Sequence, residues 1–127
     1  MEKEKTVLVV EDDIALQEAL KLKLKKEGIR VLTANSGEAA LAVLRQEMPD
    51  LITLDILLPQ MNGIEFLRQI RADKSLKDMP VVVVSVSGGT EKMREAFGLN
   101  IVDYLVKSAY KIDDLVGKIK GFLNAPS

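Results

Sequence analysis

Apolar residues along the chain fall into short runs rich in branched side chains. Segments in which apolar residues recur at helical spacing separate these runs. The clearest runs, Thr6–Val10 and Val81–Ser85, are almost wholly apolar, which is typical of strands buried on both faces of a parallel sheet. The pattern predicts five strands, over Thr6–Val10, Ile29–Ala34, Leu51–Asp55, Val81–Ser85 and Val102–Lys107.

A helix is expected after each strand, because apolar residues there recur at i, i+3 and i+4. Asp13 is a candidate N-cap for the first helix, and Gly28 ends it. Ser36 and Thr90 are candidate caps for the second and fourth helices. The last helix has the most regular apolar stripe, formed by Ile112, Leu115, Val116, Ile119, Phe122 and Leu123.

Five strands that alternate with five helices, joined by short connections, predict an α/β fold. Its parallel sheet would be doubly wound, with right-handed crossovers and helices on both faces. The 127 residues suffice for one domain over residues 1–127, and we expect an ordered core over about residues 5–123.

Composition narrows the possible functions. Lys and Arg number 18 and Asp and Glu 19, so the net charge is −1, which argues against direct nucleic-acid or anionic-membrane binding. No apolar run approaches the roughly 20 residues of a membrane-spanning helix. The charged segment Met1–Lys5 lacks the apolar core of a signal peptide. We therefore expect a cytoplasmic location, which the absence of Cys also fits.

The chain also contains no His, which excludes imidazole metal ligands and His-based catalysis within it. Any metal would need oxygen ligands, which favours Mg²⁺, Ca²⁺ or Mn²⁺.

Polar residues stand at the carboxyl ends of four predicted strands, where ligands bind in open α/β sheets. Asp12 and Asp13 follow the first strand and Asp55 ends the third. Ser85 ends the fourth strand and Lys107 the fifth. Taken singly, each has an ordinary structural interpretation: a helix cap, a turn residue, a satisfied hydroxyl or a solvated charge. Together they predict one site at one edge of the sheet.

These residue types suit phosphoryl transfer to an aspartate. Carboxylates about 5 Å apart repel one another by about 3 kcal/mol at an effective dielectric near 20, and a divalent cation relieves this repulsion. Mg²⁺ fits because it accepts a few carboxylates and leaves room for a phosphoryl oxygen. Lys107 and Ser85 can bind the same group. Asp55, alone on the central strand, is the candidate nucleophile, and Asp12 and Asp13 are candidate metal ligands.

The chain resembles the response-regulator receiver domains of bacterial two-component signal transduction over essentially its whole length. The motifs that carry the resemblance are Glu11-Asp12-Asp13, Asp55 with Pro59 and Gly63, Pro80 through Ser85, and Asp103 through Lys107. No single motif is specific for this family, but the order and spacing of the four motifs together are. The resemblance implies a flavodoxin-like strand order of 2-1-3-4-5.

The resemblance also implies a function. Asp55 would accept a phosphoryl group from a phosphohistidine of a histidine kinase or phosphotransfer protein, and the chain would catalyse its own phosphorylation and dephosphorylation. Mg²⁺, with Mn²⁺ as the alternative, would be bound by Asp12, Asp13, Asp55 and the backbone carbonyl of Leu57. Ser85 and Tyr104 would form the switch, and an output partner would bind a face within Thr90–Phe122.

The sequence departs from the family pattern in three places. Ser108 follows Lys107 where the family usually has Pro, so the bond is either a strained cis bond or trans with an altered loop. Val86 stands where a small residue is common. Leu57 and Ser87 occupy positions that tune the dephosphorylating water, and neither would orient it well. We expect a long-lived phosphoryl-Asp55.

Two other functions remain open. Ser108 and Val86 leave room for a receiver-like module that binds partners without phosphorylation. A phosphohydrolase of the haloacid-dehalogenase type would need Asp-x-Asp on one strand, which the chain lacks. The sequence does not decide between a stand-alone regulator and a domain of a longer protein such as a hybrid kinase.

Overall fold

A single five-stranded parallel sheet forms the centre of the molecule, in the order β2-β1-β3-β4-β5, as the family resemblance implied. The computed structural model describes residues 4–58, 60–86 and 89–124. The strands are β1 (Thr6–Val10), β2 (Arg30–Ala34), β3 (Leu51–Leu54), β4 (Val81–Ser85) and β5 (Asp103–Val106). The α-helices are α1 (Ile14–Lys26), α2 (Gly37–Gln46), α3 (Gly63–Ala72), α4 (Thr90–Gly98) and α5 (Ile112–Leu123). The doubly wound α/β fold is thereby confirmed.

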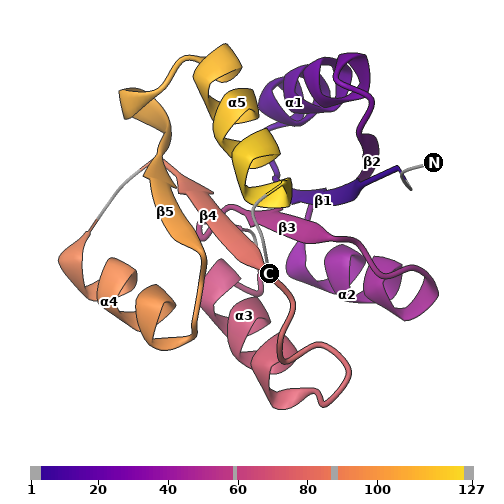
Figure 1. Cartoon of the computed structure of the whole chain (residues 1–127). Helices are drawn as coiled ribbons and strands as arrows, with labels where there is room; N and C mark the ends of the chain where they lie inside the picture. Colours follow the sequence, from indigo (N-terminus) through magenta and orange to yellow (C-terminus); the bar gives the residue numbers. More distant parts are fainter. Residues whose placement is uncertain (1–3, 59, 87–88, 125–127) are drawn as a thin grey trace.

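Helices cover both faces of the sheet, as Figure 1 shows: α1 and α5 lie on one face, and α2, α3 and α4 on the other. Two separate apolar cores result. The core beneath α1 and α5 contains Val7 and Val9 of β1, whereas Leu8 and Val10 belong to the core beneath α2, α3 and α4. This alternation follows from the two-residue period of a strand. None of the helices in the described part of the chain is long and apolar enough to cross a membrane.

Helix ends follow most of the predicted capping signals. The side chains of Asp13 and Ser36 accept hydrogen bonds from the backbone N–H of Leu16 and Ala39, as expected of N-caps. Gly28 has a φ of +78°, which explains why it ends α1. The Thr90 prediction was wrong: Gly89 occupies the N-cap position of α4 and no side chain caps this helix.

The segment after β5 resolves the question raised by Ser108. Among the described residues there is no cis peptide bond, so the Lys107–Ser108 bond is trans. Lys107–Ala109 forms a single 3₁₀ turn, which connects β5 to the start of α5. The loop is therefore altered, and β5 ends one residue before Lys107.

Candidate functional site

The strand register brings three charged residues together at the carboxyl edge of the sheet. Val10 of β1 pairs with Leu54 of β3, so the next residues, Glu11 and Asp55, are neighbours. The N–H of Asp55 donates to the carbonyl of Val10 at 3.0 Å, which extends this register by one step. Continuing the strand alternation points Glu11 and Asp55 toward the face that α1 and α5 cover. Lys107, at the start of the turn after β5, contacts both of them.

Lys107 joins the two buried carboxylates. Its Nζ lies 2.8 Å from Glu11 Oε1 and 3.0 Å from Asp55 Oδ2. The side chains of Glu11 and Asp55 are 3% and 4% exposed, so both carboxyl groups lie largely out of water. Buried charges need opposite charges or hydrogen bonds, and Lys107 supplies both. The other oxygen of Asp55, Oδ1, accepts the backbone N–H of Leu57 at 2.9 Å.

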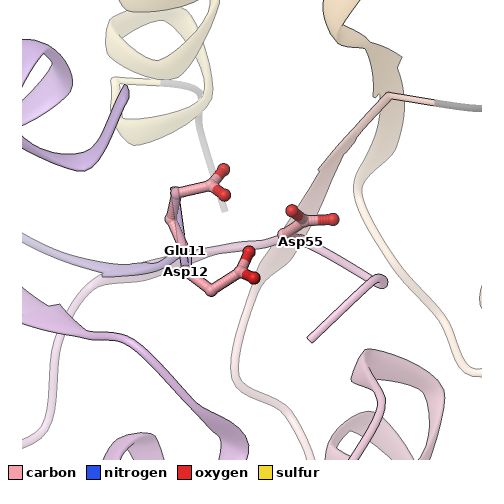
Figure 2. Close-up of side chains that lie close together, drawn as sticks. All are labelled: Glu11, Asp12 and Asp55. Atoms are coloured by element: carbon pink, nitrogen blue, oxygen red, sulfur yellow. The ribbon is translucent and has the colours of Figure 1, made fainter. Parts of the chain in front are cut away.

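An acidic group with the spacing of a metal site includes Asp55. Carboxylate oxygens of Glu11, Asp12 and Asp55 all lie within 4.8 Å of one another. Figure 2 shows the first two on the chain that leaves β1 and Asp55 beside them on the chain that leaves β3. Asp12 is exposed, so the group faces solvent on one side. Three carboxylates open to water on one side are a suitable set of ligands for Mg²⁺ or Mn²⁺.

The third member of this group differs from the sequence expectation. We expected Asp13 beside Asp12, but the structure puts Glu11 there instead. Asp13 caps α1, with its Oδ1 accepting the N–H of Leu16 at 3.2 Å, and its own N–H donates to Glu11 Oε2 at 3.1 Å. The reason is that the extended backbone continues through Glu11, whereas the chain turns into the helix at Asp13. Asp13 thus fulfils the capping prediction, and Glu11, two residues earlier in the same motif, belongs to the acidic group.

Burial and charge shift the pKa values of this cluster. Burial raises the pKa of the Glu11 carboxyl to about 7, although the hydrogen bond from Lys107 acts in the opposite direction. Burial acts to lower the pKa of Lys107, but its hydrogen bonds to Glu11 and Asp55 outweigh burial and its pKa lies above the usual value. Lys107 therefore carries a positive charge at neutral pH.

Ser85 and Tyr104 lie on the other face of the same edge. Val83 pairs with Tyr104 and Ser85 with Val106, so the two are close neighbours on strands β4 and β5. Both are buried. Burial raises the pKa of the Tyr104 hydroxyl, and a side-chain hydrogen bond with Ser85 partly opposes this shift. Tyr104 thus points inward, packed in the core beneath α2, α3 and α4.

Of the three residues expected to tune the phosphoryl lifetime, the structure describes two, Leu57 and Val86. Leu57 and Val86 expose 42% and 55% of their surface, so both project toward solvent beside Asp55 and Ser85. Ser87 lies outside the described residues, as does Pro59 of the proposed family motif.

Gly63 allows the loop after β3 to fold back under the site. Its N–H donates to the carbonyl of Ile56 at 2.7 Å. A Cβ on Gly63 would lie 2.5 Å from the Cα of Ile56 and 2.7 Å from the carbonyl oxygen of Asp55, both backbone atoms. Glycine is therefore required here by close approach. The sequence motif named Gly63, but its contact with the backbone of Asp55 appears only in the fold.

Comparison with known proteins finds close relatives. A family model described as "Response regulator receiver domain" matches residues 7–120. The transcriptional regulatory protein AfsQ1 of Streptomyces coelicolor is 38% identical over 102 residues, covering 80% of this chain and 44% of that protein. The chain spans about half the length of the curated relatives it matches.

Solved structures show the same fold. The crystal structure of the phosphorylated cyanobacterial phytochrome response regulator RcpA has a TM-score of 0.81 at 34% identity, covering 94% of this chain and 91% of that one. The Mn²⁺-bound form of the response regulator Rcp1 also has a TM-score of 0.81, at 29% identity, with 97% of each chain covered.

Proposed function

Because this chain belongs to the response regulator receiver domain family of two-component systems, we propose that it is a phosphoacceptor switch in which Asp55 takes the phosphoryl group. One observation carries the proposal: Asp55 shares its edge of the sheet with Glu11 and Asp12, and Lys107 contacts two of these three carboxylates. A nucleophile, a cation and a set of metal ligands are the parts that phosphoryl transfer needs.

In the proposed reaction a carboxylate oxygen of Asp55 attacks phosphorus, and the N–P bond of a donor phosphohistidine breaks. The O–P bond forms as the donor imidazole leaves and is protonated. Lys107 is close enough to balance charge on the transferred group, and the Leu57 N–H holds the Asp55 carboxylate in a fixed orientation. Ser85 offers a hydroxyl to a phosphoryl oxygen.

The acidic group suits a divalent metal by its chemistry and spacing. We propose that Glu11, Asp12 and Asp55 bind Mg²⁺ together with the backbone carbonyl of Leu57. Asp13, first expected as a ligand, would support them through its N–H, which donates to Glu11. Mn²⁺ is a second candidate, since it accepts the same oxygen ligands. The metal would neutralise charge on the phosphoryl group. No imidazole ligand is available, because the chain contains no His.

A histidine kinase or phosphotransfer protein is the proposed donor, acting in the cytoplasm. The chain would promote both phosphorylation and dephosphorylation of Asp55, although its main role is that of a switch. The proposed output surface lies within Thr90–Phe122 and would respond through Ser85 and Tyr104, which lie on the paired strands β4 and β5. The curated relatives are about twice as long as this chain.

Phosphorylation by acetyl phosphate tests this function directly. With Mg²⁺ present, the wild type should gain the mass of one phosphoryl group, and beryllofluoride should form an adduct. Asp55→Asn should do neither, and addition of a chelator should prevent both. A wild type that gains no mass and forms no adduct would favour the alternative, a module that binds partners without phosphorylation.

The phosphoryl group is expected to persist for longer than is usual in the family. Hydrolysis needs a water that a side chain orients in line, and the exposed side chain of Leu57 has no polar atom with which to do so. Replacing Leu57 by Asn or Glu should shorten the lifetime about tenfold, since positioned acid–base groups contribute factors of this order or more. Loss of the phosphoryl group within seconds from the Mg²⁺-bound wild type would contradict this expectation.

A further inference from the structure

A buried amide lies behind the acidic group. Gln17 occupies the inner face of α1, at the position that continues the apolar row of Leu20 and Leu24. Its side chain is 7% exposed, although the neighbours in this row are apolar. A polar group at such a position is costly unless it is hydrogen-bonded. The sequence pattern did not single out Gln17, although its spacing of three and seven residues from these leucines marks it as inward-facing.

Both N–H groups of the Gln17 amide are within reach of backbone carbonyls at the carboxyl ends of two strands. Nε2 donates to the carbonyl oxygen of Glu11 at 3.0 Å and to that of Ala34 at 3.3 Å. The N–H of Glu11 also donates to the Ala34 carbonyl at 2.9 Å. Gln17 therefore ties the end of β1 to the end of β2 and holds the peptide that links Glu11 to Asp12.

The peptide held in this way carries two of the three acidic side chains. Glu11 and Asp12 flank it, and their carboxylates must face Asp55 for the group to bind one cation. The side chain of Glu11 has further partners, Lys107 on Oε1 and the N–H of Asp13 on Oε2. The backbone and the side chain of Glu11 are thus fixed independently, the backbone by Gln17.

We infer that Gln17 is a positioning residue of the phosphoryl-acceptor site, which orients Glu11 and Asp12 toward the metal without contacting it. The inference rests on the proposed function, because it assigns this role to the same site. Partners that orient metal ligands are worth 10–100-fold in metal affinity in known sites. A purely structural glutamine would instead affect stability alone.

The test compares Gln17→Met with Leu24→Val. Met keeps the length and helix propensity of Gln but cannot donate. Leu24→Val loses buried apolar volume in the same helix, about two turns farther from the site, and so reports general destabilisation. Mg²⁺ alone is titrated by calorimetry at a temperature where circular dichroism finds every variant folded.

Gln17→Met should raise the Kd for Mg²⁺ by about tenfold, whereas Leu24→Val should leave it within about twofold of the wild type. An unchanged Kd in Gln17→Met, or an equal rise in both variants, would overturn the inference.

Hydrogen exchange in the metal-free protein separates this inference from the proposed function. The Glu11 amide, which donates to Ala34, should exchange faster in Gln17→Met than in Leu24→Val. If the wild type bound no Mg²⁺, the metal-dependent function would fail, and this exchange measurement would still decide whether Gln17 orders the backbone of Glu11. Equal exchange in the two variants would contradict the positioning role.

Discussion

The two faces of the sheet meet at the same edge but are built differently there. On the face of α1 and α5, Glu11, Asp55 and Lys107 form a cluster in which each charge has a partner. On the other face, Ser85 and Tyr104 lie on β4 and β5. Helix α4, which covers part of this face and lies wholly within the described residues, has no side-chain cap, and its one buried residue is Ala96. The first arrangement holds its side chains in place, as the proposed phosphoryl transfer requires. The second leaves a helix held by few buried contacts, which suits an element that moves.

The largest expected effect comes from removing the cation at the centre of the charged cluster. Lys107→Met should lower the free energy of unfolding by about 3 kcal/mol, because Glu11 and Asp55 lose their buried partner. Phosphorylation by acetyl phosphate should slow by about 100-fold, as for loss of one stabilising donor. Urea unfolding and mass-detected labelling measure the two effects.

The matched control is Lys74→Met, at an exposed lysine in the connection after α3. It should change stability by less than about 0.5 kcal/mol and leave labelling unaltered. If Lys107→Met changed stability and labelling as little as this control does, the charged cluster would not account for the difference between the two faces.

Gly63→Ala should have the next largest effect, about 2–3 kcal/mol of destabilisation, because the added Cβ meets backbone atoms of Ile56 and Asp55 that have little freedom to move. Thermal unfolding measures it. Gly121→Ala is the comparison, since a Cβ at that helical position has nothing within 4 Å and should stabilise α5 by about 0.5–1 kcal/mol. A tolerated alanine at Gly63 would show that the loop beneath Asp55 can shift without cost.

A smaller loss of stability is expected on the face that α2, α3 and α4 cover, where α4 has few buried contacts. The guanidinium of Arg71 in α3 donates to the carbonyl of Leu99 at 2.7 Å, which ties the end of α4 to α3. It also donates to the carbonyl of Lys77, in the connection after α3, at 3.0 Å. Arg71→Gln should cost about 1.5 kcal/mol and speed amide exchange in α4, while the Kd for Mg²⁺ stays within about twofold. Exchange that rose equally in α1 would argue that the two faces do not differ in this way.

The smallest expected effect concerns the surface pair between α1 and α5. The hydrogen bond from Lys23 lowers the pKa of the exposed Asp113 carboxyl, at a distance of 2.7 Å. A carboxyl with a lowered pKa stabilises the fold above its unfolded value and loses this contribution as the pH falls through its folded value. Asp113→Asn should therefore shift the urea midpoint slightly at pH 7 and not at all in strong acid.

Asp114→Asn provides the baseline for this measurement, because it removes a charge from the same first turn of α5. Subtracting its effect removes the interaction with the helix dipole, which both aspartates share. High salt should abolish the remaining difference, since the pair is exposed. If the difference between the urea midpoints of Asp113→Asn and Asp114→Asn persisted at high salt, solvent would not screen the Lys23–Asp113 pair as expected for an exposed pair.

Sequence alone determined the elements and most of the residues that stand at the carboxyl edge of the sheet. Apolar runs and helical spacing located all five strands to within a residue at each end. The signal is strongest in β1, β3 and β4, which are buried at every position and therefore read as continuous apolar runs. The positions of Asp55, Ser85 and Lys107 at strand ends followed directly, since parallel strands share one carboxyl edge.

Only the tertiary structure shows which of these side chains contact one another. Three acidic residues follow β1, and only the path of the backbone shows that Glu11 joins Asp12 and Asp55 while Asp13 caps α1. The buried amide of Gln17 has partners 6 and 17 residues away in the chain, and Lys107 reaches across 52 residues to Asp55. Periodicity reports which face of an element is buried, but not which atoms another element brings to it, so these contacts could be read only from the fold.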